Sequence, residues 1–251
     1  MAIDQNSTPY EVFTLPEDRH KGEIRSPITQ GMILAAIWIA GSVWSIKTAE
    51  SNFGQDLNAL FIFLMIYLWF NVIFSVVEII GLAFRHRYLR QQWDRIDGGL
   101  RGRGAELFGE ALKTPVNHRN LFDTKAWCNG FIAWGIMDRD YATQNGFGYI
   151  AELGNGAFSF WPNHLMIMFL VGATVSPMIT GMVGLAFFYQ TIWGTTLYKI
   201  GLICFGNNSE NSAKGNFLLI WGNLPWLVMS IVGLYAAVHM IMDNSYQVFF
   251  G

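Results

Sequence analysis

The 251-residue chain is too apolar for a water-soluble domain. Hydrophobic residues make up 52% of it and charged residues only 14%, where a soluble protein carries about 25% charged residues. The formal net charge of -2 gives no support for a nucleic-acid partner, and two cysteines are too few for a disulfide framework. The apolar residues stand in runs too long for barrel strands, so the sequence predicts an all-α polytopic membrane protein, a single domain over 1–251 surrounded by the lipid bilayer.

The first segment, 1–27, is polar and mixed in charge, so no cleavable signal peptide is expected. It carries Arg19, Lys21 and Arg25 ahead of the first apolar run. Because lysine and arginine beside a span favour the cytoplasmic side, we expect the N-terminus in the cytoplasm.

Four apolar runs have a length suited to the membrane. A helix needs about 20 apolar residues to cross the hydrocarbon core of a bilayer. The predicted transmembrane helices are 28–46, 57–84, 165–189 and 217–242. Pro177 predicts a kink in the third of them.

Between the second and third runs, residues 85–125 hold nine of the sixteen lysines and arginines, which predicts a basic cytoplasmic loop. The stretch Ala126–Met137 follows with 12 residues, too few to cross alone. It predicts an interfacial or re-entrant helix, or a full span if its charged borders are included. The choice between four and five crossings, and the side of the C-terminus, stay open.

The third run carries small residues four apart. They are Gly172, Ser176, Thr180 and Gly184. Small side chains on one helix face let a second helix approach closely in lipid, so this face is predicted to pack against protein. Gly233 and Ala237 in the last run are one candidate mate, and another subunit is the alternative.

Glu78 is the single acidic residue deep in a predicted span, and Asn71 shares its helical face. An ionisable side chain in the membrane is costly unless it is paired or hydrated, so both are candidate functional residues. The alternative is a structural role near the headgroups, since Arg85 follows only seven residues later.

Candidate metal ligands are sparse. His239 and Asp243 are four apart and share a face at the end of the last run, and His164 stands at the start of the third. Imidazole and carboxylate ligands suit copper and other transition metals, so these three residues are the predicted site if a metal is bound. A glycine-rich stretch is flanked by Asp138, Arg139 and Asp140 on one side and Glu152 on the other. The two aspartates, one residue apart, form either a cation site or part of a solvated turn.

Three short stretches carry a resemblance to a known family. They are Phe160–His164 (FWPNH), Ile179–Gly181 (ITG) and Val232–Leu234 (VGL) ahead of His239. Their order resembles that in the C subunit of the copper membrane monooxygenases that oxidise methane or ammonia, which implies a subunit of such an oxidoreductase complex. The family's Asp-x3-His-x12-His copper motif is missing, because Phe147 and Ala151 stand at its Asp and first His. Tyr235 likewise replaces the asparagine before the later histidine.

Three functions are consistent with these features. The first is a non-catalytic or scaffold subunit of a larger membrane complex, supported by the small-residue face. The second is a subunit of a membrane monooxygenase with a metal held by His164, His239 and Asp243. The third is a transporter or channel subunit that uses Glu78 and Asn71. Catalysis by this chain on its own is not expected.

Overall fold

The computed structural model describes residues 26–96, 101–118, 120–144, 146–205 and 211–250. Most of these residues are helical and none forms a β-strand, which confirms the all-α prediction. Nearly all of the predicted N-terminal segment, 1–27, lies outside the described residues.

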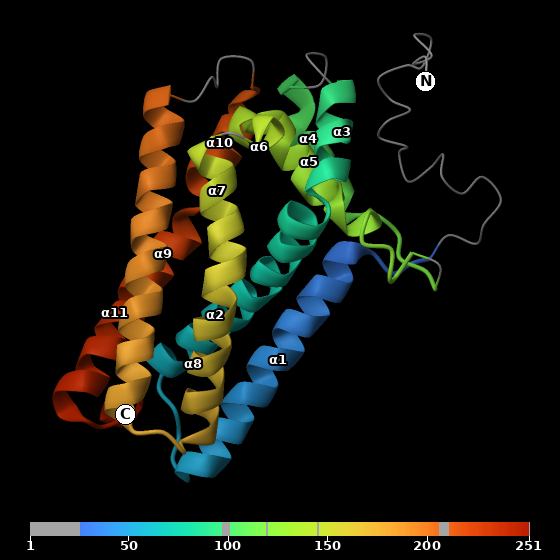
Figure 1. Ribbon diagram of the computed structural model, residues 1–251. Helices are drawn as coiled ribbons and strands as arrows, with labels where there is room; N and C mark the ends of the chain where they lie inside the picture. The colour runs from blue at the N-terminus through green and yellow to red at the C-terminus, as the bar shows by residue number, and fades with distance from the viewer. Residues whose placement is uncertain (1–25, 97–100, 119, 145, 206–210, 251) are drawn as a thin grey trace.

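Long helices lie side by side along most of the molecule, and short helices gather at one end (Figure 1). The long helices are α1 (Gln30–Phe53), α2 (Ala59–Glu78), α8 (Phe160–Gly172), α9 (Pro177–Phe205) and α11 (Leu224–Asp243). The short helices are α3 (His86–Ile96), α4 (Gly104–Leu112), α5 (Asn129–Met137), α6 (Arg139–Thr143), α7 (Phe147–Gly154) and α10 (Ala213–Trp221). We call α3 to α6 with α10 the helical cap, and the opposite end, where α1 connects to α2, the distal end.

Three helical stretches of the described residues are long and apolar enough to cross a membrane: Gln30–Phe53, Ala59–Phe84 and Ala213–Asp243. They correspond to the first, second and fourth predicted spans. The second includes a π-helical segment, η1 (Ile79–Phe84), and the third joins α10 to α11. Helices of this kind support the prediction of a multi-pass membrane protein.

Polar side chains and a glycine mark the ends of the first two long helices. Thr29 Oγ1 accepts a hydrogen bond from the Met32 N–H at the start of α1, and Asn58 Oδ1 accepts from the Phe61 N–H in α2. These contacts satisfy N–H groups that have no partner within the helix. Gly54, with φ of 64°, ends α1 in the left-handed conformation that glycine adopts without strain.

The prediction that 165–189 forms one continuous helix is wrong. α8 ends at Gly172, Ala173 has a left-handed φ of 49°, and α9 begins only at Pro177. The reason is local. Proline lacks an N–H and disfavours helical geometry at the residue before it, so here it starts a helix instead of kinking one.

Both halves of that run belong to longer helical stretches. α8 continues back through the π-helical segment η4 (Asn155–Ser159) into α7, so the chain is helical from Phe147 to Gly172. α9 continues for 29 residues to Phe205. The apolar run in the sequence therefore covers the junction of two helices.

The segment 85–125, predicted as a basic loop between spans, is partly helical among its described residues, and its cytoplasmic side stays a prediction. It contains α3 and α4, together with a short 3-10 turn, η2 (Arg101–Arg103). Ala126–Met137 is confirmed as a helical unit, made of η3 (Ala126–Cys128) and α5. Because α5 packs against α3 and α4, its apolar side chains are covered by protein.

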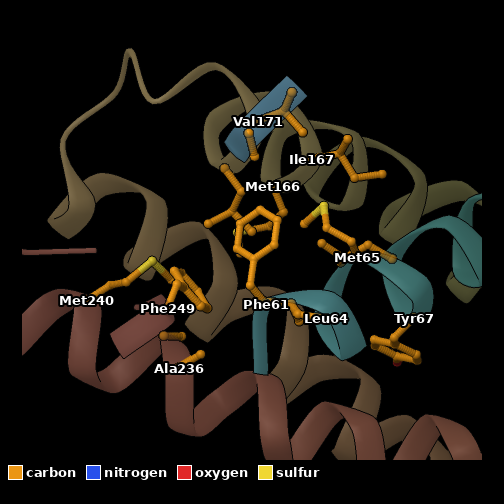
Figure 2. Packing of buried hydrophobic residues seen from close by; sticks show 14 of the residues in the cluster. Phe61, Leu64, Met65, Tyr67, Met166, Ile167, Val171, Ala236, Met240 and Phe249 are labelled. Carbon is orange, nitrogen blue, oxygen red and sulfur yellow. The ribbon is translucent and has the colours of Figure 1, made fainter. Parts of the chain in front are cut away.

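Two hydrophobic cores hold the described residues together. In the first, Phe61 and Met65 of α2 meet Met166 of α8, with Met240 of α11 and Phe249 beside them (Figure 2). The second core lies in and below the helical cap and includes Leu82, Leu89, Trp93, Ile132, Met137, Tyr141 and Leu219. The candidate site lies where these two cores meet.

Candidate functional site

One face of α2 is polar although it is buried. Tyr67, Asn71, Ser75 and Glu78 follow one another at intervals of three or four residues, and none is more than 3% exposed. In a helix with 3.6 residues per turn, this spacing places all four side chains on one side. The predicted pair of Glu78 and Asn71 therefore belongs to a longer polar row.

A second polar row faces the first. It consists of Glu152 in α7, Asn155 and Ser159 in η4, and Asn163 in α8. α2 packs against both η4 and α8, and Asn163 Nδ2 donates to the Leu68 carbonyl oxygen of α2 at 2.9 Å. We call the two rows together the polar seam.

The seam ends on a pair of carboxyl groups. The carboxyls of Glu78 and Glu152 are close enough to interact electrostatically and to share a hydrogen bond. Asn155 Nδ2 donates to Glu78 Oε2 at 3.1 Å, and Asn155 Oδ1 accepts from the Ser159 hydroxyl at 2.9 Å. Within the described part of the chain, no lysine, arginine or histidine forms an ion pair with either glutamate. Two carboxyl groups so placed can share a proton or hold a cation.

Irregular helix geometry positions this pair. Glu78 directly precedes the π-helical segment η1, and Asn155 opens the π-helical segment η4. Such segments are rare and occur frequently at functional sites. Gly156 lies against Glu78, where a Cβ would come within 2.9 Å of the Glu78 Cβ. Glycine therefore permits the close approach of η4 to α2.

Three buried polar atoms of the seam have no hydrogen-bond partner in the protein: Asn71 Nδ2, Ser75 Oγ and Asn163 Oδ1. Asn71 uses only its Oδ1, which accepts from the Trp226 indole N–H at 3.2 Å. An unsatisfied buried polar atom costs on the order of 1–3 kcal/mol, and ordered water commonly satisfies such atoms. The seam is therefore suited to hold water between α2 and α8.

A cavity of about 250 Å³ adjoins the carboxyl pair. Glu78, Glu152 and Tyr141 line it, and the rest of its wall is mainly aromatic and aliphatic, from α1, α2, α4, α5, α10 and α11. A second cavity of about 120 Å³ shares Glu152, Asn223 and Trp226 with the first and reaches α9. The carboxyl pair thus borders internal space.

A third carboxyl group is buried nearby. The Tyr198 hydroxyl donates to Asp138 Oδ2 at 2.6 Å, and the Asp140 N–H donates to Oδ1 at 3.1 Å. Burial raises the pKa of Asp138 to about 6, although both hydrogen bonds favour the charged form. The interpretation of this cluster as a solvated turn is wrong for Asp138, which is buried, and for Glu152, which lies beside Glu78, whereas Arg139 and Asp140 are exposed.

The predicted metal ligands are not gathered into one site. His239 Nδ1 lies 3.2 Å from Asp243 Oδ2 on α11, as their spacing predicts. His164 lies on α8, where its Nδ1 is 2.7 Å from the Phe160 carbonyl oxygen. Among the described residues, no group of three or more His, Cys, Asp or Glu side chains could hold a metal ion. The described residues therefore do not assemble a copper centre within this chain.

The row of small residues divides at the break between α8 and α9. Gly172 ends α8, and Ser176 precedes α9. Thr180 and Gly184 lie within α9, where a Cβ at Gly184 would come 3.2 Å from the Ala237 Cβ of α11. Ala237 is therefore a contact of this face, and the partner helix belongs to the same chain.

No family model, no curated protein and no solved structure matches the chain. The resemblance to the copper monooxygenase subunit therefore assigns no family. The chemistry of the site follows from its own residues.

Sequence reasoning missed Glu152 and Asn155 as neighbours of Glu78. Their spacing with Ser159 was a usable signal, but the glycines beside Asn155 indicated a turn and hid the helix. Arg85, the expected alternative partner of Glu78, donates instead to Thr124 Oγ1 at 2.6 Å.

Proposed function

We propose that the protein is a membrane transporter or channel subunit in which the polar seam and the carboxyl pair carry protons or small cations. The observation that supports this proposal is the pairing of Glu78, which is buried, with the half-buried Glu152, because neither carboxyl group has a basic partner among the described residues. Ionisable residues inside membrane helices are costly and typically mark proton or ion pathways.

The dimensions of the seam are consistent with a hydrated path. Tyr67 and Glu78 are 11 residues apart on α2, which corresponds to about 16 Å at 1.5 Å per residue. This is roughly half of the 30 Å hydrocarbon core. At the far end, the Tyr67 and Ser230 hydroxyls are 2.7 Å apart and either can donate, so they can pass on a proton.

The arrangement of the helices supports five crossings in place of four. The stretch from α7 to α8 and the helix α9 lie alongside the three candidate spans (Figure 1). With five crossings, the helical cap and the end of α11 are on opposite sides of the membrane. The basic residues of the cap favour the cytoplasm, so the C-terminus of α11 would face outside.

A scaffold subunit of a larger complex is the second candidate. α1 buries only polar or small side chains and exposes apolar ones such as Ile37, Ile39 and Val43, a face that a partner subunit or lipid can cover. The small-residue face supports a scaffold role less strongly, because Gly184 packs against helices of the same chain. The monooxygenase subunit stays a prediction without a metal site among the described residues.

The test is ion flux through the purified chain in vesicles. With a pH-sensitive dye inside and a potassium diffusion potential across the membrane, we expect proton flux above that of protein-free vesicles. Glu78→Gln and Glu152→Gln should each lower it by at least about tenfold, because either change removes one ionisable group from the pair.

The matched control is Glu110→Gln in α4, a partly exposed carboxylate beside Lys113 and outside the seam. It should leave the flux unchanged. Equal flux in the wild type and in both seam variants, or no flux above empty vesicles for protons, Na⁺ and K⁺, would contradict the proposal.

A further inference from the structure

The larger cavity has walls suited to an apolar body. Its aromatic lining includes Phe70, Phe74, Phe131, Trp134 and Trp226. These side chains come from α5 of the cap and from the long helices α2 and α11 (Figure 1).

The aromatic rings of the wall are packed against one another. The ring centroids of Phe70 and Phe74 are 4.6 Å apart, and both lie within 5.2 Å of the Trp226 ring. On the cap side, Phe108 and Trp134 have centroids 5.7 Å apart. Mutual packing of this kind holds the rings in place, so the cavity is formed before a ligand enters.

The charged side chains of the wall are both acidic. Glu78 is 3% exposed and lines the cavity beside Glu152, and no basic side chain among the described residues neutralises them. A ligand whose polar group is a hydrogen-bond donor with positive charge would satisfy this wall. Aromatic faces add to the attraction for such a cation, through the negative potential over the rings.

The size of the cavity limits the ligand. An apolar cavity of about 150 Å³ holds benzene, so a volume of about 250 Å³ accommodates one aromatic ring with a short side chain. Leu112, which is 41% exposed, is part of the lining and places one edge of the cavity near the protein surface.

We propose that this cavity binds an organic ammonium ion with a single-ring apolar body, the ammonium lying at the carboxyls of Glu78 and Glu152 and the ring among the aromatic side chains. Only the role of this ion in transport, as the cargo or as a competitor of the transported cation, rests on the proposed transport function. The binding itself can be measured without flux.

The experiment compares two ligands that differ in charge. The full chain in lipid nanodiscs is titrated calorimetrically with 2-phenylethylamine and with 2-phenylethanol at pH 7.5, against empty nanodiscs. We expect saturable binding of the amine and at least about tenfold weaker binding of the alcohol, which lacks the charge.

Variants locate the site. Glu152→Gln should weaken amine binding by about tenfold, and Phe131→Leu by about threefold or more, as loss of one cation–π contact implies. The control is Phe122→Leu, because Phe122 is 86% exposed and lies outside the cavity. Binding of the amine should be unchanged in it.

Several results would overturn the proposal: equal binding of amine and alcohol, no amine binding beyond that of empty nanodiscs, or unaltered binding in both cavity variants. The comparison of the two ligands needs only the wild type, so it holds even if a variant fails to fold. Proton flux without amine binding would remove this proposal and leave the transport function. Amine binding without ion flux would remove the transport function and leave the binding proposal.

Discussion

Asp138 shows how a single residue couples this fold to pH. Its carboxyl is buried at the start of α6, and burial raises its pKa to about 6 from an ordinary value of 3.8. The native state therefore takes up a proton at a higher pH than the unfolded state does. Between about pH 6 and pH 4 the native state binds more protons, so this group makes the protein more stable as the pH falls.

We predict that Asp138→Asn removes this pH dependence. The asparagine keeps an oxygen for the Asp140 N–H and does not ionise, so the variant avoids a cost on the order of 2–3 kcal/mol that the wild type carries above pH 6. Thermal unfolding in detergent should show a Tm difference, variant minus wild type, that is more positive at pH 7.5 than at pH 4.5.

The control for this prediction is Asp56→Asn, on the exposed connection between α1 and α2. Its effect on the Tm should be small at both pH values. If the Tm difference for Asp138→Asn is the same at pH 4.5 and pH 7.5, the carboxyl is not protonated in the fold as its burial requires.

At the scale of the elements, glycines let α9 and α11 approach each other closely. A Cβ at Gly181 would come 2.7 Å from the Ala237 carbonyl oxygen, and one at Gly184 would come 3.0 Å from Met166 Cε. Close backbone approach replaces the hydrophobic driving force that lipid does not provide. Gly172, at the end of α8, makes no such contact with another helix, since its nearest neighbour is Thr174.

Gly184→Leu should therefore destabilise the fold by about 1–3 kcal/mol, because the larger side chain has no room between α8, α9 and α11. The matched control is Gly201→Leu in the same helix, where a Cβ would meet nothing within 4 Å. Thermal unfolding in detergent distinguishes the two. Equal Tm values for both variants would show that α9 and α11 separate easily at Gly184.

At the scale of the whole molecule, charge is distributed unequally between the two ends. Every lysine and arginine of the described residues except Lys47 lies in the helical cap, in its connections or at the cap end of a long helix (Figure 1). The structure adds Arg139, Lys199 and Lys214 to the basic side that the sequence assigned to 85–125. An asymmetry of this kind favours a cytoplasmic cap.

Cysteine labelling tests this orientation. In a Cys204→Ser background, where Cys128 is buried, Gln55→Cys at the distal end should react with an impermeant maleimide on intact cells. His118→Cys, on the connection between α4 and α5, should react only after permeabilisation. Labelling of both positions from the same side, or of His118→Cys alone from outside, would contradict the orientation.

Much of the fold followed from the sequence because long apolar runs have few alternatives in lipid. The first two spans, the last span and the helix Ala126–Met137 appear where the pattern predicted them. The sequence singled out Glu78 and Asn71 because polar side chains stand out in an apolar run, and both are buried in the structure. The interval of four between His239 and Asp243 likewise predicted their contact, since helix geometry alone determines it.

The tertiary structure decided what hydropathy does not record. Pro177 starts α9 because Ala173 turns the chain, a conformational choice that apolar character does not reveal. Glu152 reaches Glu78 because Gly156 lets η4 approach α2 closely and α7 packs against η1, although these residues are far apart in the chain. Local sequence patterns determine which residues form helices and which of them avoid lipid. The pairing of buried polar side chains depends on contacts between distant segments, which only the packed structure specifies.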